Sequence, residues 1–392
     1  METIVLQDNE ILKDQVYGNL EFDVLIKVVG DNVVIDNILV YSPVKDFHRM
    51  IQVSGKNCTI KNCRFQDISV NGACIVVEHE EESNYCVIQD CLFMNRTKTD
   101  KNNGLEMIRL GESKTSQMGE GRNIIINNRF ENLEGEIEII SVKNNRNIIV
   151  NNELVNSAGT FTLRHGKNSI VAFNYIDGKM KTDSGGIRVV DTGHIVKGNV
   201  IQNIKGDGLR AGVSLMCGIK DSPLNRYFTV EECTIAYNYF MNCENALSLG
   251  MQKKEANIRP QLVTLVNNKF ELCKNEKSKH KDSVGCESEV LDNYNPIEFV
   301  TKPVEFSLKP FDDLYEELVR FNYETEEQLE EKEEPEPEPE VCIGPRMVDI
   351  DIFTTKLTKK LKMMVAMKKL EKIKLDMANN LKEFKLLIEE LK

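Results

Sequence analysis

Two carboxylates, a lysine and an arginine carry the chemistry that this sequence offers. Glu136 and Glu138 stand two residues apart in a segment rich in Ile, so in a strand both side chains face the same side. Like charges at that spacing repel each other unless a cation or a basic residue lies between them. Carboxylate oxygens are ligands that calcium prefers. The pair therefore predicts a calcium site, with an Asn amide oxygen from the preceding coil as a further ligand.

Lys143 and Arg164 bring positive charge to the same region. They are 21 residues apart, which is nearly one repeat of this chain, so we expect them on neighbouring rungs of one sheet, about 4.8 Å apart. A lysine and an arginine at that spacing can flank a single sugar ring. The same residues also fit a solvated ladder of opposite charges on a sheet surface, which stabilises a protein only modestly. Spacing alone leaves both interpretations open.

A recurring phrase of β-branched residues, an Asn, a variable residue and an apolar residue indicates the fold. The phrase contains Asn128, Asn152, Asn174 and Asn199, at steps of about 22 to 25 residues, which is the size of one solenoid repeat. The segments are strand-like and bounded by Asn, Asp and Gly. We predict an all-β chain folded as a right-handed parallel β-helix. Its Asn row lies at one corner, where each side chain bonds the next and tolerates the left-handed backbone of a sharp turn.

Cysteine takes the place of Asn in the earlier copies of the phrase. Cys58 and Cys63 are followed by Cys86 and Cys91 at the same internal spacing, which predicts stacked small apolar residues in successive coils. The chain has eleven cysteines and no CxxC pair. We expect reduced thiols rather than disulfides or a metal site.

Charge and hydropathy narrow the classes of partner. With 62 acidic and 50 basic residues the formal charge is −12, which argues against nucleic acid as the main ligand. No apolar run is long enough to span a membrane. The first residues lack the basic and apolar regions of a secretory signal, so the sequence predicts a cytoplasmic or virion-associated protein.

Several motifs, in order and at compatible spacings, resemble those of the chondroitinase B and alginate lyase family of polysaccharide lyases. They are Glu136-Ile-Glu-Ile-Ile-Ser-Val-Lys143, Leu163-Arg-His-Gly166 and Gly185-Gly-Ile-Arg-Val189. A weaker match runs through Ser222-Pro-Leu-Asn-Arg-Tyr227. The resemblance covers roughly residues 30 to 275 and implies cleavage of an anionic uronate polysaccharide by calcium-assisted β-elimination. Relatives are typically exported, which contrasts with the expected location of this chain.

The resemblance also implies a role for each matching residue. Glu136 and Glu138 match the calcium-binding carboxylates of the family, and Asn103 matches its Asn ligand. Lys143 matches the base, and Arg164 matches the residue that assists the leaving group. In such a reaction calcium and the arginine stabilise the negative charge that develops beside the uronate carboxylate.

Three further residues fall where the family contacts its substrate. They are His165, Arg188 and, in the weaker match, Arg226. The later coils that complete the substrate cleft in longer relatives are replaced here by unrelated sequence. A second function therefore stands beside the lyase, namely a non-catalytic β-helix that binds glycan as an attachment or structural module.

The last third of the chain differs in composition from the repeats. We expect a β-helix over residues 1–275, then an irregular segment over 276–323 that covers or ends it and contains a short helix from Phe311 to Phe321. An acidic, Pro-rich linker over 324–345 follows. Residues 346–392 form an amphipathic helix in which apolar residues alternate at steps of three and four. That helix either joins two copies of the chain, packs back on the β-helix, or docks on an acidic surface or anionic membrane through its lysines.

Deletion of residues 346–392 tests self-association. The β-helix should remain folded while the mass per particle measured by light scattering falls, because the seam that joins two copies is removed. An unchanged mass per particle would show that the helix does not join copies.

Overall fold

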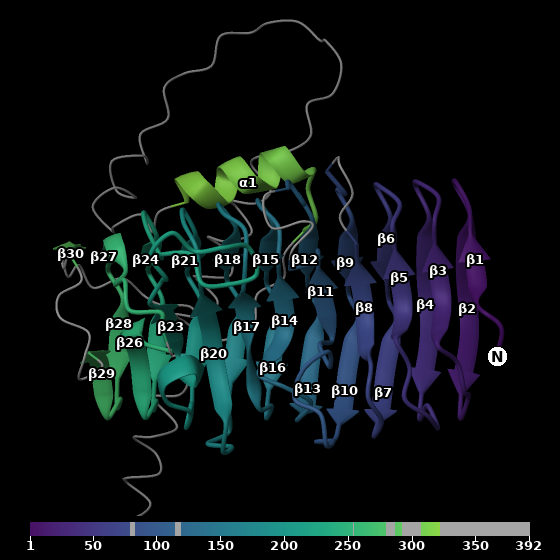
Figure 1. The fold of residues 1–392 in the computed structure, drawn as a ribbon, viewed down its shortest axis with the longest axis horizontal. Coiled ribbons are helices and arrows are strands. Elements are labelled where there is room, and N and C mark those ends of the chain that lie inside the picture. The colour runs from purple at the N-terminus through teal and green to yellow at the C-terminus, as the bar shows by residue number, and fades with distance from the viewer. Residues whose placement is uncertain (79–82, 114–118, 254, 280–286, 292–306, 322–392) are drawn as a thin grey trace, which may run out of the picture. The chain divides into compact units, whose positions relative to one another are not determined.

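Parallel strands stacked coil upon coil form the described part of the chain. The structure, a computed structural model, describes residues 1–78, 83–113, 119–253, 255–279, 287–291 and 307–321. All of them belong to a unit that ends at Leu329. The chain winds from β1 at one end of the stack to β29 and β30 at the other (Figure 1). The predicted right-handed parallel β-helix is confirmed.

The first sheet, sheet A, has eleven strands and receives one strand from each coil. In spatial order they are β1 (Ile4–Leu6), β3 (Val24–Val28), β5 (Arg49–Val53), β8 (Ala73–Val77), β11 (Ile108–Leu110), β14 (Glu138–Val142), β17 (Gly159–Leu163), β20 (Ser184–Val189), β23 (Val213–Met216), β26 (Asn245–Met251) and β29 (Asn275–Lys279).

The second sheet, sheet B, has nineteen strands in two rows that meet at a corner. β2 (Ile11–Gly18) and β4 (Val34–Tyr41) run through both rows. The first row consists of β6 (Thr59–Lys61), β9 (Val87–Gln89), β12 (Ile124–Ile126), β15 (Ile148–Val150), β18 (Ile170–Ala172), β21 (Ile195–Lys197), β24 (Thr234–Ala236), β27 (Gln261–Val266) and β30 (Glu287–Leu291). The second row consists of β7 (Arg64–Ile68), β10 (Leu92–Arg96), β13 (Arg129–Leu133), β16 (Glu153–Val155), β19 (Tyr175–Asp177), β22 (Val200–Gln202), β25 (Tyr239–Met241) and β28 (Lys269–Glu271).

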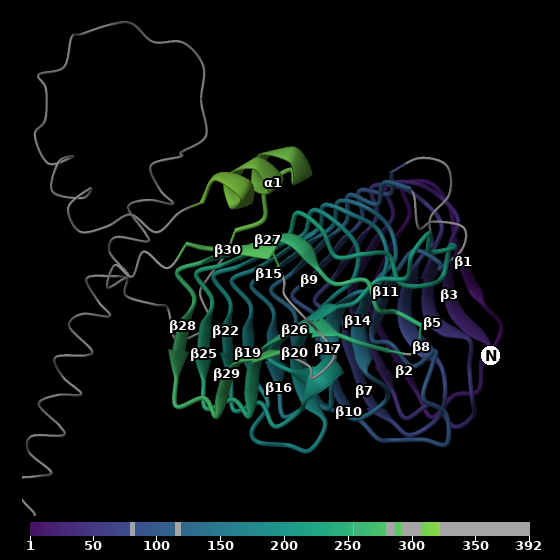
Figure 2. The same cartoon turned by 60° about the vertical axis from the view of Figure 1, so that its left-hand side comes forward.

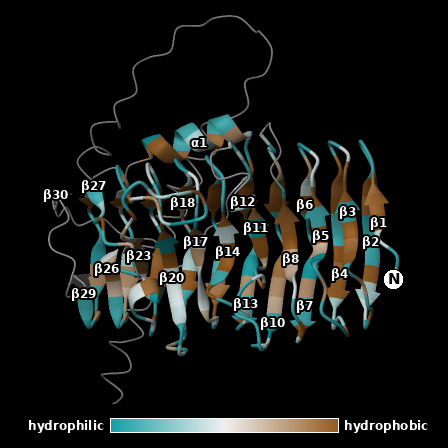
Figure 3. Ribbon diagram, viewed as in Figure 1, coloured by the Kyte–Doolittle hydropathy of each residue, from teal (hydrophilic) through white to brown (hydrophobic). Residues whose placement is uncertain are grey.

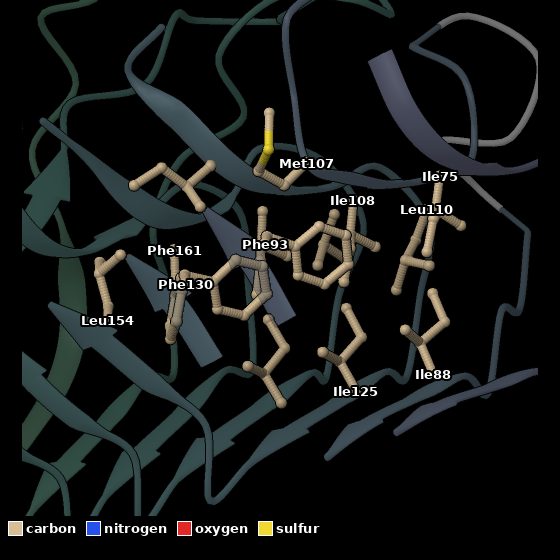
Figure 4. Packing of buried hydrophobic residues seen from close by; sticks show 14 of the residues in the cluster. Ile75, Ile88, Phe93, Met107, Ile108, Leu110, Ile125, Phe130, Leu154 and Phe161 are labelled. Carbon is tan, nitrogen blue, oxygen red and sulfur yellow. The ribbon is translucent and has the colours of Figure 1, made fainter. Parts of the chain in front are cut away.

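Apolar side chains from all three faces fill the interior of the coils. Phe65, Phe93 and Phe130 stack on successive coils, with ring centroids 5.0 and 4.8 Å apart. Figure 4 shows this stack beside aliphatic residues from both sheets, including Ile108 and Ile125. Because identical positions pack on one another along the stack, each coil buries its apolar face only against its neighbours.

The predicted Asn row is confirmed, and it continues beyond Asn199. Each Nδ2 donates to the Oδ1 of the next Asn at 2.9–3.0 Å, from Asn128 through Asn152 and Asn174 to Asn199 and Asn238. The left-handed backbone conformation was predicted for the Asn residues of the row themselves, and this part of the prediction is wrong. The residue before each of them has positive φ instead, as in Asn127 and Asn151, so one residue turns the chain and the next bonds along the stack.

The early cysteines extend the same corners toward the N-terminal coils. Asn128 Oδ1 accepts the Cys91 N–H at 3.0 Å, and Asn123 Oδ1 accepts the Cys86 N–H at 3.0 Å. Cys58, Cys63, Cys86 and Cys91 are buried thiols. The expectation of stacked, reduced cysteines holds for these residues.

One helix lies outside the first row of sheet B. The expected short helix is α1 (Phe311–Arg320), and the apolar side chains of Phe311, Leu314 and Leu318 pack on the outward residues of β12, β15 and β18. Figure 2 shows α1 against this row. The hydropathy colouring in Figure 3 shows that hydrophobic and hydrophilic residues alternate along α1. The predicted linker and C-terminal helix lie outside the described residues. Within the described part, no helix has the length and apolar composition needed to cross a bilayer.

Substitution of Asn152 by Ala tests the Asn row. Asn152 Oδ1 accepts from both the N–H and Nδ2 of Asn128, and its own Nδ2 donates to Ile125 O at 2.9 Å. Each buried group left unpaired costs roughly 1–3 kcal/mol, so the melting temperature should fall by several degrees. The exposed Asn257→Ala serves as the control. Equal melting temperatures for the two variants would show that the row does not stabilise the coils.

Candidate active site

The site residues gather on the outer face of sheet A, on the neighbouring strands β11, β14, β17 and β20. Their inward residues, such as Ile140 and Val142 in β14, are fully buried in the core, so the residues between them face outward. The outward residues stand in register from strand to strand, in the order Arg109, Ser141, Thr162 and Arg188. Functional groups from distant parts of the sequence are thereby brought to adjacent rungs.

A β-bulge in β14 places Glu138 and Lys143 on the same face. They are five residues apart, so strict alternation would send them to opposite faces. Glu138 pairs with Thr160 and Ile140 pairs with Phe161, which leaves Ile139 as an extra residue that resets the alternation. Ser141 then faces outward with Glu138, and its Oγ donates to Glu138 Oε2 at 2.6 Å.

Lys143 and Arg164 lie on neighbouring rungs, as their spacing predicts. Val142 pairs with Leu163, and the Arg164 N–H donates to Val142 O at 2.8 Å. The turn after Arg164 depends on Gly166, which has φ of +84°. A Cβ there would lie 2.3 Å from the backbone of Asn144 in the preceding coil, so a larger residue would displace the end of the rung.

Glu138 is held by cations. Its Oε1 lies 3.2 Å from Arg188 Nη1 and 3.8 Å from Arg164 Nε. Burial raises the pKa of Glu138, but the charges of Arg188, Lys143 and Arg164 and the Ser141 hydrogen bond outweigh burial, so the net pKa lies below its ordinary value. Glu138 is therefore a carboxylate at neutral pH.

Glu136 is not compensated in this way. The pKa of Glu136 is raised to about 8, mainly by burial and by the negative charge of Glu106, and to a smaller extent by that of Glu138. A hydrogen bond from the Leu105 N–H and the charge of Lys143 lower this pKa, but they do not outweigh the other effects. Glu106 itself is 1% exposed, and its Oε2 has no hydrogen-bond partner. Its Oε1 lies 3.4 Å from Lys143 Nζ. Arg109 Nη1 lies 3.6 Å from the same oxygen, so the nearby cations contact Glu106 rather than Glu136.

Glu106 is the site residue that sequence reasoning missed. It stands in Asn103-Gly-Leu-Glu106, where only Asn103 was assigned a role. Glu106 stands thirty residues before Glu136, which is the length of one coil with its insertion. That spacing was the signal that could have identified Glu106. Asn103 is exposed in the same loop, and its side chain makes no hydrogen bond to the described residues.

A guanidinium lies inside the β-helix behind these carboxylates. Arg96 ends β10 at an inward position that Ile68 and Leu133 occupy on the neighbouring coils, and its side chain is 1% exposed. Burial lowers the pKa of Arg96, whereas negative charge on Cys74, Glu136 and Glu106 would raise it. An unpaired buried charge is costly, and its position makes Arg96 an internal counter-charge for the two glutamates.

His165 is buried and neutral. Burial first, and then the charges of Arg164, Lys143 and Arg188, lower the pKa of His165 to about 2. Nδ1 lies 3.3 Å from Arg164 Nη1, and because a guanidinium only donates, Nδ1 accepts and Nε2 carries the proton. Nε2 makes no hydrogen bond. His165 thus presents a donor to the site and cannot act there as a general acid.

The insertion between β23 and β24 covers one side of Arg164. The Arg164 guanidinium carbon lies 4.5 Å from the centre of the Tyr227 ring, and Nη1 donates to Arg226 O at 3.1 Å. The Arg226 side chain is exposed. The structure therefore brings together Glu136, Glu138, Lys143, Arg164, His165 and Arg188, and it places Arg226 beside them through its backbone.

Three solved structures that resemble this fold are lyases. An alginate lyase of polysaccharide lyase family 6 (PL6), solved with a trisaccharide, is 21% identical with a TM-score of 0.55, over 68% of this chain and 74% of that one. A mannuronic acid specific PL6 lyase from human gut microbiota is 22% identical with a TM-score of 0.55, over 71% and 76%. An alginate lyase in complex with G6 is 21% identical with a TM-score of 0.53, over 68% and 74%. At these identities the similarity establishes the fold.

Sequence comparison assigns the family. No curated protein matches the chain. The family model of chondroitinase B matches residues 31–293, which is most of the chain and contains every site residue described above. The chain belongs to the chondroitinase B family of polysaccharide lyases.

Proposed function

We propose that this lyase cleaves a uronate polysaccharide of the alginate or chondroitin and dermatan sulfate type by β-elimination, with calcium as cofactor. The observation that supports the proposal best is the placement of Lys143 and Arg164 on neighbouring rungs beside three carboxylates. A surface ladder of opposite charges would be exposed and paired throughout. Here Lys143 is 8% exposed, and Glu106 Oε2 is buried without a partner.

The carboxylates fit a calcium ion. Burial and the nearby negative charge of Glu106 raise the pKa of Glu136 to about 8, as expected for two carboxylates held close together. No three His, Cys, Asp or Glu side chains of the described residues form a metal cluster by themselves. The proposed calcium ligands are Glu136 and either Glu106 or Glu138. The Asn103 amide and the substrate carboxylate would complete the ligand set. Calcium bound there would neutralise the substrate carboxylate as a Lewis acid.

Lys143 is the base in this proposal. Its Nζ, as the neutral amine, takes the proton from C5 of the uronate, the C–H electrons form the double bond between C4 and C5, and the C4–O bond breaks. Glu106 at 3.4 Å orients Nζ, because it is the carboxylate in contact with the amine. The leaving oxygen then takes a proton from water.

Arg164, His165 and Arg188 stabilise the developing charge. Arg164 remains charged, and Tyr227 and Arg226 O hold its guanidinium in place. His165 donates from Nε2 to a substrate oxygen. Arg188, which is 2% exposed and paired with Glu138, keeps that carboxylate ionised next to Lys143.

Substitution of Lys143 by Ala separates the base from the rest of the site. Turnover of alginate, chondroitin or dermatan sulfate, followed by the absorbance of the unsaturated uronate product, should fall by roughly a hundred- to ten-thousand-fold because the proton acceptor is lost. Binding of calcium and of oligosaccharide should persist. Lys27→Ala, another lysine on the same face of sheet A, is the control. Binding without turnover by the unmodified protein would instead identify a glycan-binding module.

Substitution of Glu136 by Gln tests the carboxylate corner without relying on turnover. The pKa of Glu136 in the folded protein is about 8, above the ordinary 4.5, so the folded state holds this proton more tightly than the unfolded state does. The carboxyl therefore stabilises the fold fully below about pH 4.5, and this stabilisation is lost as pH rises through about 8. Gln stays neutral, so in chelator the variant should melt at a higher temperature than the unmodified protein at pH 9 and at a similar temperature at pH 4.

The same variant should bind terbium, a luminescent substitute for calcium, more weakly than the unmodified protein. The exposed Glu255→Gln controls for loss of one negative charge. If Glu136→Gln raises the melting temperature equally at pH 4 and pH 9, Glu136 does not carry the proton assigned to it.

A further inference from the structure

Charge is distributed differently on the two sides of the Lys143 and Arg164 pair along the stack. On the side of the earlier coils, Arg49 and Arg109 are nearly covered, with 7% and 13% of their side chains exposed. Both contact Glu112, at 3.0 and 2.8 Å, and Arg49 also pairs with Glu78. The carboxylates are the more exposed partners, at 36% for Glu112 and 27% for Glu78. The two arginines on this side are therefore engaged in ion pairs and are not free to bind a polyanion.

The side of the later coils is built from two segments that are tied together. Gly218 and Ile258 form an antiparallel bridge, with N–H to O distances of 2.6 and 2.8 Å, and Tyr227 O accepts from the Ile219 N–H at 2.8 Å. The insertion after β23 and the loop after β26 therefore form one surface. Tyr227 and Lys253 both belong to it.

Cations on this surface are exposed and gathered around one ring. Lys253 Nζ lies 5.9 Å from the centre of the Tyr227 ring, the same ring that Arg164 contacts at 4.5 Å. Arg226 is exposed and adjacent in sequence. Within the described part of the chain, neither Lys253 nor the Arg226 side chain forms an ion pair. Tyr227 thus connects a free lysine to the arginine of the reaction site.

We propose that Lys253, together with Tyr227 and the Arg226 side chain, forms a subsite for the anionic sugar next to the one that is cleaved, on the side of the later coils. The proposal rests on the proposed function and extends it to substrate binding. The lysine and arginine contact a carboxylate or a sulfate ester, and the tyrosine ring fixes the distance between this contact and Arg164. The substrate chain extends over the later coils, because the Lys253 and Arg226 side chains there form no ion pair among the described residues, whereas Arg49 and Arg109 on the other side are paired with Glu78 and Glu112.

Lys253→Gln tests the subsite without touching the reaction site. The side chain is exposed, so the fold is retained, and only a contact to bound substrate is lost. We expect KM for the cleaved polysaccharide to rise by roughly three- to tenfold, the effect of about one charged contact, while kcat is unchanged. Arg226→Gln should also raise KM, because the exposed guanidinium that contacts the substrate is lost.

Lys220→Gln is the matched control. It removes one exposed positive charge from the same insertion. The cations over the Tyr227 ring are Arg164 and Lys253. If Lys220→Gln raises KM as much as Lys253→Gln, the effect is one of net charge and the subsite is wrong. Binding of alginate and dermatan sulfate oligosaccharides to the Lys143→Ala protein, measured by calorimetry, distinguishes a carboxylate-only ligand from a sulfated one.

The failure of this subsite differs from the failure of the proposed function. If the unmodified protein cleaves a uronan and Lys253→Gln has the same KM, the subsite is overturned and the lyase assignment stands. If the unmodified protein cleaves none of the three polymers and the Lys143→Ala protein binds none of their oligosaccharides, the proposed function fails, and the subsite fails with it.

Discussion

The register between parallel rungs of sheet A is the constraint on which the site depends. Hydrogen bonds between coils fix outward residues of successive strands about 4.8 Å apart. The Asn row from Asn128 to Asn238 holds that register at the opposite corner of the coil, because each amide bonds both its neighbour and the backbone of adjacent coils. Lys143 and Arg164 can serve one sugar ring only because this spacing does not vary.

Charge compensation is the second constraint, and it divides the site into two halves. Glu138 is surrounded by Arg188, Arg164 and Lys143, and its pKa stays low despite burial. Glu136 faces Glu106, and its pKa is raised to about 8. One half thus concentrates positive charge around a carboxylate, and the other brings two carboxylates together. Arg96 limits the repulsion in the second half from inside the β-helix.

The sequence predicts the fold and the placement of Lys143 beside Arg164 because both follow from repetition. A period of 22 to 25 residues identifies the coil, and one coil separates Lys143 from Arg164. What repetition cannot reveal is local irregularity. The bulge at Ile139, which places Glu138 and Lys143 on one face, leaves no mark in an alternating pattern. Glu106 and Arg96 come from coils with insertions, and Arg96 occupies an inward position where the pattern predicts an apolar residue. Tyr227 and Lys253 lie on segments without a repeat, so only the folded structure brings them together.

The solenoid explains how the chain tolerates so many buried charges at one place. In a compact domain, the desolvation of Lys143, Arg188, Glu106 and Arg96 would weaken a single shared core. In a β-helix each coil contacts only its neighbours, so the cost remains in the few coils that carry the site. Those coils also contain the Phe93 and Phe130 stack and the central part of the Asn row. Aromatic and amide stacking therefore lies in the same coils as the buried charges, and it keeps their rungs in register.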